Sequence, residues 1–183
     1  MCGIVGITST KKVSATILNS LRKLEYRGYD SAGIATLESG IIKEVKCEGR
    51  VDDLEHNLSK QKLEGNIGIG HVRWATHGVP SIVNAHPHSS DKVSVVHNGI
   101  IENSTILKKL LIKKGYVFKS QTDTEVIVHL ITEYLKKNDL KNSIIKMLKR
   151  VHGSFALGII FQDQPDLIVG ARRGSPLAVG YGP

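Results

Sequence analysis

Cys2 is the residue of this sequence best suited to nucleophilic chemistry. Removal of Met1 would leave one residue that carries both a thiol and a free α-amine. An α-amine has an ordinary pKa of about 7.7–8.0, so at neutral pH a useful fraction of it can accept the thiol proton. The alternative is that Cys2 stands at this position by chance and packs as a small hydrophobic residue. The segment Gly3–Thr8 directly behind it favours the first interpretation, because an apolar strand would anchor this terminus inside the fold.

A second group of candidate residues lies in the segment HVRWATHG at positions 71–78, where a strand end runs into a glycine-terminated turn. Arg73 offers a planar guanidinium that can bind a carboxylate through two parallel hydrogen bonds. Thr76 and His77 can add hydrogen bonds, and Trp74 can form an apolar lid. Taken alone, Arg73 is equally compatible with an ordinary structural ion pair.

Two further positions suit acyl-transfer chemistry. Asn98 supplies a side-chain amide, and Gly99 supplies a backbone N–H that no side chain covers, so together they can hold the oxyanion of a tetrahedral intermediate. Asn-Gly alone is more often a turn. Asp123 stands at a predicted helix entrance, where an aspartate usually caps the helix, and its functional alternative is to pair with a substrate ammonium group.

A cluster of histidines raises the possibility of a metal site. Its members lie within a short stretch: His71, His77, His86, His88 and His97. No HExxH motif and no Cys/His pairing accompanies them, so we expect no metal site. No G-x-G-x-x-G loop follows a strand either, which argues against a nucleotide site, and we expect no cofactor.

The elements that must position these residues are expected in two groups of strands separated by helices. Strands are predicted at 3–8, 32–37, 41–45, 67–72, 93–97, 154–161, 167–171 and 177–180, and helices at 13–24, 52–61, 104–114, 124–137 and 140–151. The strand at 93–97 is expected to end at Asn98-Gly99, and Thr122, Asp123 and Glu125 resemble a capping box. The long polar segment 74–92 is expected to be a functional loop. This order predicts an α+β protein of layered sheets and helices within a single domain over 1–183.

The net charge of +8, from 25 Lys and Arg against 17 Asp and Glu, raises the question of a nucleic-acid partner. Most of the lysines have the spacing of solvent-exposed helix faces and no aromatic residues are interleaved with them, so we expect no nucleic-acid binding. No stretch approaches the ~18 apolar residues of a membrane span, and the amino terminus does not read as a secretory signal. Two cysteines without CxxC spacing suit a reducing compartment, so the cytoplasm is the expected location.

The sequence strongly resembles the amino-terminal glutaminase domain of the glucosamine-6-phosphate synthase family, a class II glutamine amidotransferase family. The resemblance rests on blocks in family order: MCGIVGI at 1–7, LEYRGYDSAGIA at 24–35, HVRWATHG at 71–78, NAHPH at 84–88, VHNGIIEN at 96–103 and TDTEVI at 122–127. It implies the four-layer αββα sandwich of N-terminal-nucleophile (Ntn) hydrolases. The nearest rival is the phosphoribosylpyrophosphate amidotransferase branch, which shares the CGI and HNG blocks and differs around them.

The resemblance also implies residue roles. Cys2 would attack the side-chain amide of glutamine, with Asn98 and Gly99 as the oxyanion hole. Arg73 would bind the substrate α-carboxylate and Asp123 its α-ammonium group. Thr76, His77 and Trp74 would complete the substrate pocket. A further group would support the pocket without contacting the substrate, namely Arg27, Gly28, Tyr29, Asp30 and His86.

Two departures from the family pattern carry expectations. In the family, a sugar-isomerase part follows the glutaminase domain, and this part is absent from the sequence. A carboxy-terminal isomerase domain is therefore the expected partner in the full-length enzyme. The full-length enzyme is expected to be a homodimer, and the isolated domain a monomer. The sequence also retains Met1, and a chain that keeps it is expected to fold without activity. A non-catalytic glutamine-binding module is the alternative from another functional class, and the intact set of site residues disfavours it.

Overall fold

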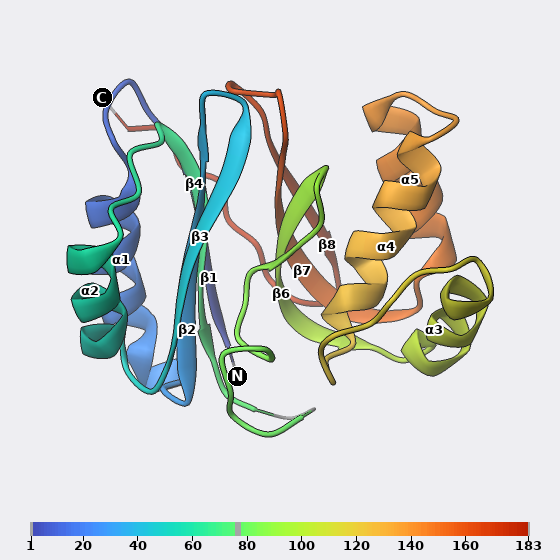
Figure 1. The fold of residues 1–183 in the computed structure, drawn as a ribbon, viewed down its shortest axis with the longest axis horizontal. Coiled ribbons are helices and arrows are strands. Elements are labelled where there is room, and N and C mark those ends of the chain that lie inside the picture. Colours follow the sequence, from blue (N-terminus) through green and yellow to red (C-terminus); the bar gives the residue numbers. More distant parts are fainter. Residues whose placement is uncertain (1, 76–77, 183) are drawn as a thin grey trace.

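Four layers of secondary structure make up the molecule, as the computed structural model shows for residues 2–75 and 78–182 (Figure 1). Two helices cover one sheet, three helices cover a second sheet, and the two sheets face each other in the middle. The arrangement confirms the predicted α+β class and its αββα layering.

The first sheet has the strand order β1-β4-β2-β3 and is antiparallel throughout. Its strands are β1 (Gly3–Thr8), β2 (Ser31–Glu38), β3 (Ile41–Glu48) and β4 (Ile67–Arg73). Helices α1 (Ser14–Leu24) and α2 (Val51–Lys60) pack on its outer face through apolar side chains that include Ile17, Leu21 and Leu54. A short 3-10 turn, η1 (Glu25–Arg27), connects α1 to the segment that precedes β2.

The second sheet has the order β5-β6-β7-β8 and is also antiparallel. Its strands are β5 (His88–Ser89), β6 (Val93–Ile101), β7 (Gly153–Phe161) and β8 (Ile168–Arg173). Helices α3 (Ser104–Lys113), α4 (Thr124–Leu135) and α5 (Leu140–Arg150) cover its outer face and enclose the largest apolar cluster of the protein. A third cluster, which includes Ile69 of β4 and Val96 of β6, fills the space between the sheets.

Three of the sequence-based expectations are wrong. Strand β6 does not end before Asn98-Gly99, because its ladder with β7 continues through Ile101, which pairs with Gly153. Residues 177–180 form no strand. The capping box at α4 is absent: the Asp123 side chain accepts the N–H of Ile101 instead, and Glu125 accepts the N–H groups of Lys119 and Ser120.

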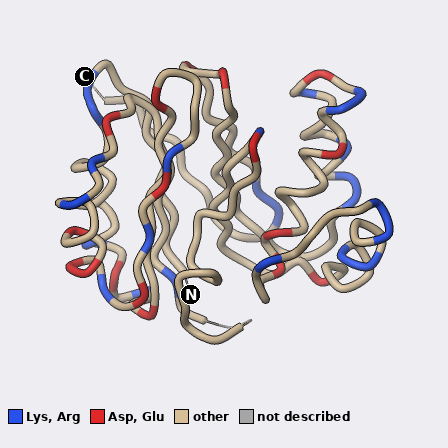
Figure 2. Tube along the Cα trace, viewed as in Figure 1, with Lys and Arg blue, Asp and Glu red and all other residues tan. Residues whose placement is uncertain are grey.

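The lysines behave as expected for solvated helix faces. Those of α3–α5 and their flanks are exposed except for the half-buried Lys108, and Figure 2 shows Lys and Arg on the outer helices together with Asp and Glu. Along residues 2–75 and 78–182, no helix combines the length and the apolar character needed to cross a bilayer.

Candidate active site

The thiol of Cys2 lies at the end of the first sheet, beside the carboxyl end of β4. The register of β1 against β4 pairs Gly3 with Val72, which brings Cys2 next to the residues that follow β4. Its Sγ donates to the carbonyl oxygen of Trp74 at 3.7 Å and accepts the N–H of Trp74 at 3.4 Å. Burial raises the pKa of the Cys2 thiol, while the Trp74 hydrogen bond and the Arg73 charge act against that shift. The raised pKa favours the neutral thiol, so this group would need a base to act as a nucleophile.

Several of the residues expected in the site line one small cavity, although Asn98 is not among its lining residues. It is lined by residues of both sheets and of the start of α4: Cys2, Arg73, Trp74, His86, His97, Gly99, Thr122, Asp123 and Thr124. The volume of about 30 Å³ is close to that of a single water molecule in the liquid. Six of the residues named from the sequence, far apart along the chain, thus surround the same point.

Opposite charges face this cavity from its two sides. Arg73 is 3% exposed, and its guanidinium donates to the carbonyl oxygens of Gly78 at 3.0 Å and Val79 at 3.4 Å. The Asp123 side chain is 10% exposed and accepts the N–H of Ile101 through Oδ2 at 2.7 Å. A buried cation and a half-buried carboxylate that line the same narrow cavity suit a zwitterionic ligand, because each can pair with one charge of it.

The RGYD segment supports the thiol from behind. Arg27 donates from Nε to the carbonyl oxygen of Cys2 at 3.3 Å. The N–H of Asp30 donates to the Arg73 carbonyl oxygen at 3.2 Å, and its carboxylate accepts the N–H of Ala75. The ring of Tyr29 meets Trp74 edge-on, with 5.7 Å between the ring centroids, and Trp74 keeps 48% of its surface exposed.

Gly28 is required in that segment because the backbone of β4 comes very close. A Cβ at this position would lie 2.5 Å from the Arg73 carbonyl carbon and 2.7 Å from the Trp74 nitrogen, which no real side chain tolerates. The segment that precedes β2 and the end of β4 therefore fit together only with glycine here.

Asn98 and Gly99 lie within β6. Asn98 is half-buried and shares a strand face with Val96, which packs between the sheets, so its side chain is on the side of the first sheet. Gly99 has φ of +136°, and a Cβ there would lie 2.1 Å from the carbonyl oxygen of Ser154 in β7. Gly99 thus adopts a backbone conformation that favours glycine without leaving the ladder. Thr76 and His77, also expected in the pocket, lie outside the described residues.

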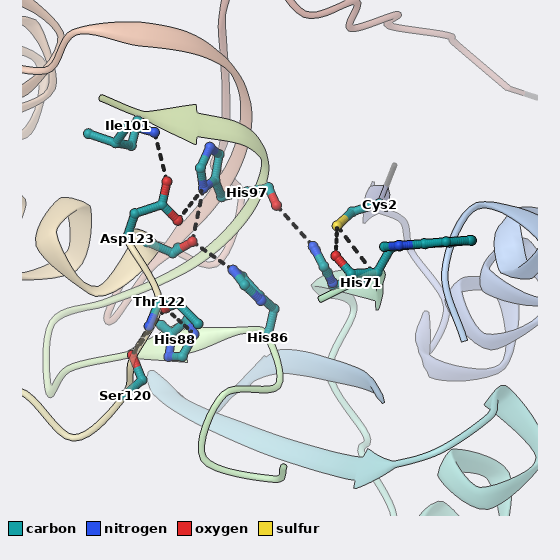
Figure 3. A network of polar contacts seen from close by, with 11 residues as sticks. Cys2, His71, His86, His88, His97, Ile101, Ser120, Thr122 and Asp123 are labelled. Atoms are coloured by element: carbon teal, nitrogen blue, oxygen red, sulfur yellow. Dashed lines mark hydrogen bonds and ion pairs between the residues drawn. The ribbon is translucent and has the colours of Figure 1, made fainter. Parts of the chain in front are cut away.

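The buried histidines form a polar cluster rather than a metal centre. His71 stacks on His86 with 4.2 Å between ring centroids, and His86 meets His88 edge-on at 4.6 Å (Figure 3). Burial lowers the pKa of His71 and of His88 to about 3 and that of His86 well below its ordinary value. Within the described part of the chain, no three His, Cys, Asp or Glu side chains are arranged to hold a metal ion.

Thr122 and Thr124 are site residues that the sequence reasoning missed. Thr124 Oγ1 lies 2.7 Å from His86 Nε2 and 2.9 Å from His97 Nδ1, and Thr122 Oγ1 lies 2.9 Å from His88 Nε2 (Figure 3). A buried histidine needs a polar partner. The hydroxyls of Thr122 and Thr124 could therefore have been recognised in the sequence as candidate partners for the histidines.

Comparison with known proteins agrees with this geometry. Residues 75–180 match the family model described as a glutamine amidotransferase domain, and the chain belongs to that family. It is 55% identical, over its whole length, to a glutamine–fructose-6-phosphate aminotransferase (isomerizing) of Mesorhizobium japonicum and 53% identical, over 98% of its length, to that of Clostridium acetobutylicum. The chain spans 30% of the length of each of these relatives.

A solved structure confirms the Ntn-hydrolase fold. The chain is similar to the glutamine phosphoribosylpyrophosphate amidotransferase of B. subtilis in complex with ADP and GMP, with a TM-score of 0.78 and 29% identity over 88% of this chain and 35% of that one. The identity to the aminotransferases is far higher than this value. The glucosamine-6-phosphate synthase type is therefore favoured over the rival branch.

Proposed function

We propose that residues 1–183 act as one glutaminase domain that hydrolyses the side-chain amide of L-glutamine to glutamate and ammonia. The observation that carries the proposal is the cavity that the Cys2 thiol shares with the buried Arg73 and the half-buried Asp123. In the longer protein, a carboxy-terminal isomerase domain receives the ammonia and uses it to form glucosamine-6-phosphate from fructose-6-phosphate. The names of the relatives and the 30% of their length that the chain spans support this second step. We propose the cytoplasm as the location of the enzyme, and a homodimer as its full-length form.

Substrate binding follows from the charges. Arg73 pairs with the α-carboxylate of glutamine and Asp123 with its α-ammonium group, so the side-chain amide points toward Cys2. We propose that Thr76 and His77 add hydrogen bonds and that Trp74 covers the ligand. The cavity is small, and Trp74 at its edge is half exposed, so a shift of this side chain would enlarge the space for the substrate.

The reaction begins with proton transfer from the thiol. The α-amine of Cys2 accepts that proton, and the sulfur forms a bond to the amide carbon, whose oxygen becomes an oxyanion held by the Asn98 amide and the Gly99 N–H. The α-ammonium then protonates the leaving nitrogen, the carbon–nitrogen bond breaks, and ammonia departs from a thioester. Water attacks the thioester with the same amine as base, which releases glutamate and restores the thiol.

The decisive test is glutamate release by a preparation whose amino terminus has been verified by mass. Chains that begin at Cys2 are expected to release glutamate, whereas Cys2→Ala and chains that retain Met1 are expected to be folded and inactive. Cys2→Ala that keeps the wild-type rate would contradict the proposed nucleophile. Full turnover in chains with intact Met1 would contradict the α-amine as base.

A further inference from the structure

Beside the cavity, and partly lining it, a set of buried polar residues joins the two sheets and has no part in the chemical steps above. The set comprises four histidines and two threonines, most of which are labelled in Figure 3: His71, His86, His88, His97, Thr122 and Thr124. The histidines come from β4, from β5 and the segment before it, and from β6. The threonines lie just before α4 and at its first residue. Buried polar groups that are hydrogen-bonded to one another fix one arrangement of their surroundings. We asked what this set holds in place.

One hydrogen bond of the set crosses between the sheets. His71 Nε2 lies 2.9 Å from the carbonyl oxygen of His97. A carbonyl oxygen only accepts, so Nε2 carries the hydrogen and donates, and the neutral His71 ring is fixed in that tautomer. His71 precedes Arg73 by two residues on β4, and His97 directly precedes Asn98 on β6. The bond therefore ties the strand of the carboxylate-binding arginine to the strand of the oxyanion donors.

Thr124 joins two histidines of the set, His86 and His97. It is fully buried, and its hydroxyl contacts both His86 and His97. A hydroxyl can donate to one ring nitrogen and accept from the other, which an apolar side chain of the same shape cannot do. The Asp123 carboxylate lies 3.8 Å from the same His97 Nδ1, so Asp123 and Thr124 face His97 together.

We propose that Thr124 is a positioning residue for glutamine hydrolysis. Its hydroxyl holds the rings of His86 and His97 and so fixes Asn98-Gly99 at a set distance from Asp123. The oxyanion donors and the carboxylate for the α-ammonium group then keep their spacing during turnover. This inference rests on the proposed glutaminase function.

The test compares Thr124→Val, which keeps the side-chain shape and removes the hydroxyl, with Thr124→Ser, which keeps the hydroxyl. Oxyanion donors act mainly in the transition state, so Thr124→Val is expected to lower kcat about 10- to 100-fold with a smaller change in KM. Thr124→Ser is expected to stay within about threefold of wild type, since a small shift of one hydroxyl preserves most of a network. All rates are normalised to Cys2 thiols that react with an affinity label, so that a loss of folded protein does not lower the measured kcat.

If Thr124→Val does not fold, Thr124→Ala and Thr124→Ser form a second pair, which differs by one hydroxyl oxygen. Equal kcat and KM in the members of either folded pair would overturn the inference while leaving the proposed function intact. A wild-type rate that persists in Cys2→Ala would instead refute the proposed function. Nitrogen NMR of the imidazoles supplies a readout besides activity: the signals of His86 and His97 are expected to change in Thr124→Val and not in Thr124→Ser, and unchanged signals would also count against the inference.

Discussion

Two features of the structure restrict position 99 to glycine. Its φ of +136° lies in a region that side chains rarely adopt, and the space a Cβ would need is filled by the backbone of Ser154 and Phe155. The ladder with β7 continues through this residue, since Gly99 pairs with Phe155 and both of its neighbours are paired as well. Backbone strain of this kind is retained where the surrounding structure enforces it, often at functional sites.

Gly99→Ala is therefore expected to reduce the free energy of unfolding by about 3 kcal/mol or more and to abolish measurable glutamate release. Gly115→Ala is a matched control: its φ is also positive, at +90°, but nothing lies within 4 Å of the added Cβ. The control should lose about 1–2 kcal/mol and keep its activity. Urea unfolding of both variants measures the difference, and equal losses would show that the contact with β7 is unimportant.

Among the elements, the junction between the segment after η1 and the end of β4 sets the geometry of the site. The Arg73 and Trp74 backbone packs directly on Gly28, while Asp30 binds the same stretch through its N–H and its carboxylate. One junction thus places both the Arg73 guanidinium, which we propose binds the substrate carboxylate, and the backbone groups that contact the Cys2 thiol.

Gly28→Ala is expected to displace that stretch and lower kcat/KM for glutamine about 10- to 100-fold, because misplacement by about 1 Å is enough for such a loss. Gly6→Ala in β1 is the control, since the nearest atom to its added Cβ is Ile168 Cγ2 at an ordinary 3.5 Å. Steady-state glutaminase kinetics distinguish the two. Wild-type kcat/KM in Gly28→Ala would mean that the junction tolerates a side chain.

The sequence predicted most helices and strands because their apolar periodicity is regular, and it placed the αββα layers through the family resemblance. It failed where a backbone contact between distant residues decides the outcome. Asn98-Gly99 reads locally as a turn, but pairing with β7 keeps it in a strand. Asp123 reads as a helix cap, but the N–H of Ile101 binds its carboxylate. The role of Thr124 depends on two histidines that only the fold brings together.

At the scale of the whole molecule, the buried histidines make folding sensitive to acid. The pKa of His71 and of His88 falls to about 3 in the folded protein, and that of His86 is also lowered, because burial disfavours the charged rings. The unfolded chain therefore binds more protons than the folded one below about pH 6.5. Stability from this source is complete above that pH and is lost as the pH falls toward 3.

Each such histidine contributes a slope of up to about 1.4 kcal/mol per pH unit between its two pKa values, so the three together can remove a substantial part of a typical domain's stability by about pH 5. Urea unfolding between about pH 7.5 and pH 5 is expected to show this steep loss. Exposed His56 gives the control, since His56→Gln should leave the slope unchanged. A free energy of unfolding that is flat over this range would show that the rings protonate within the fold.

Strand β1 starts at Gly3, so no residue separates the nucleophile from the sheet edge that anchors it. An affinity tag fused ahead of Cys2 would convert its α-amine into an amide. On the proposed mechanism, that nitrogen could then no longer act as the base. Figure 1 shows the carboxyl end of the described chain on the opposite side of the molecule from its amino end. Purification tags and fluorescent fusions on this domain therefore belong at its carboxyl end, and the choice of vector decides whether an active enzyme is obtained.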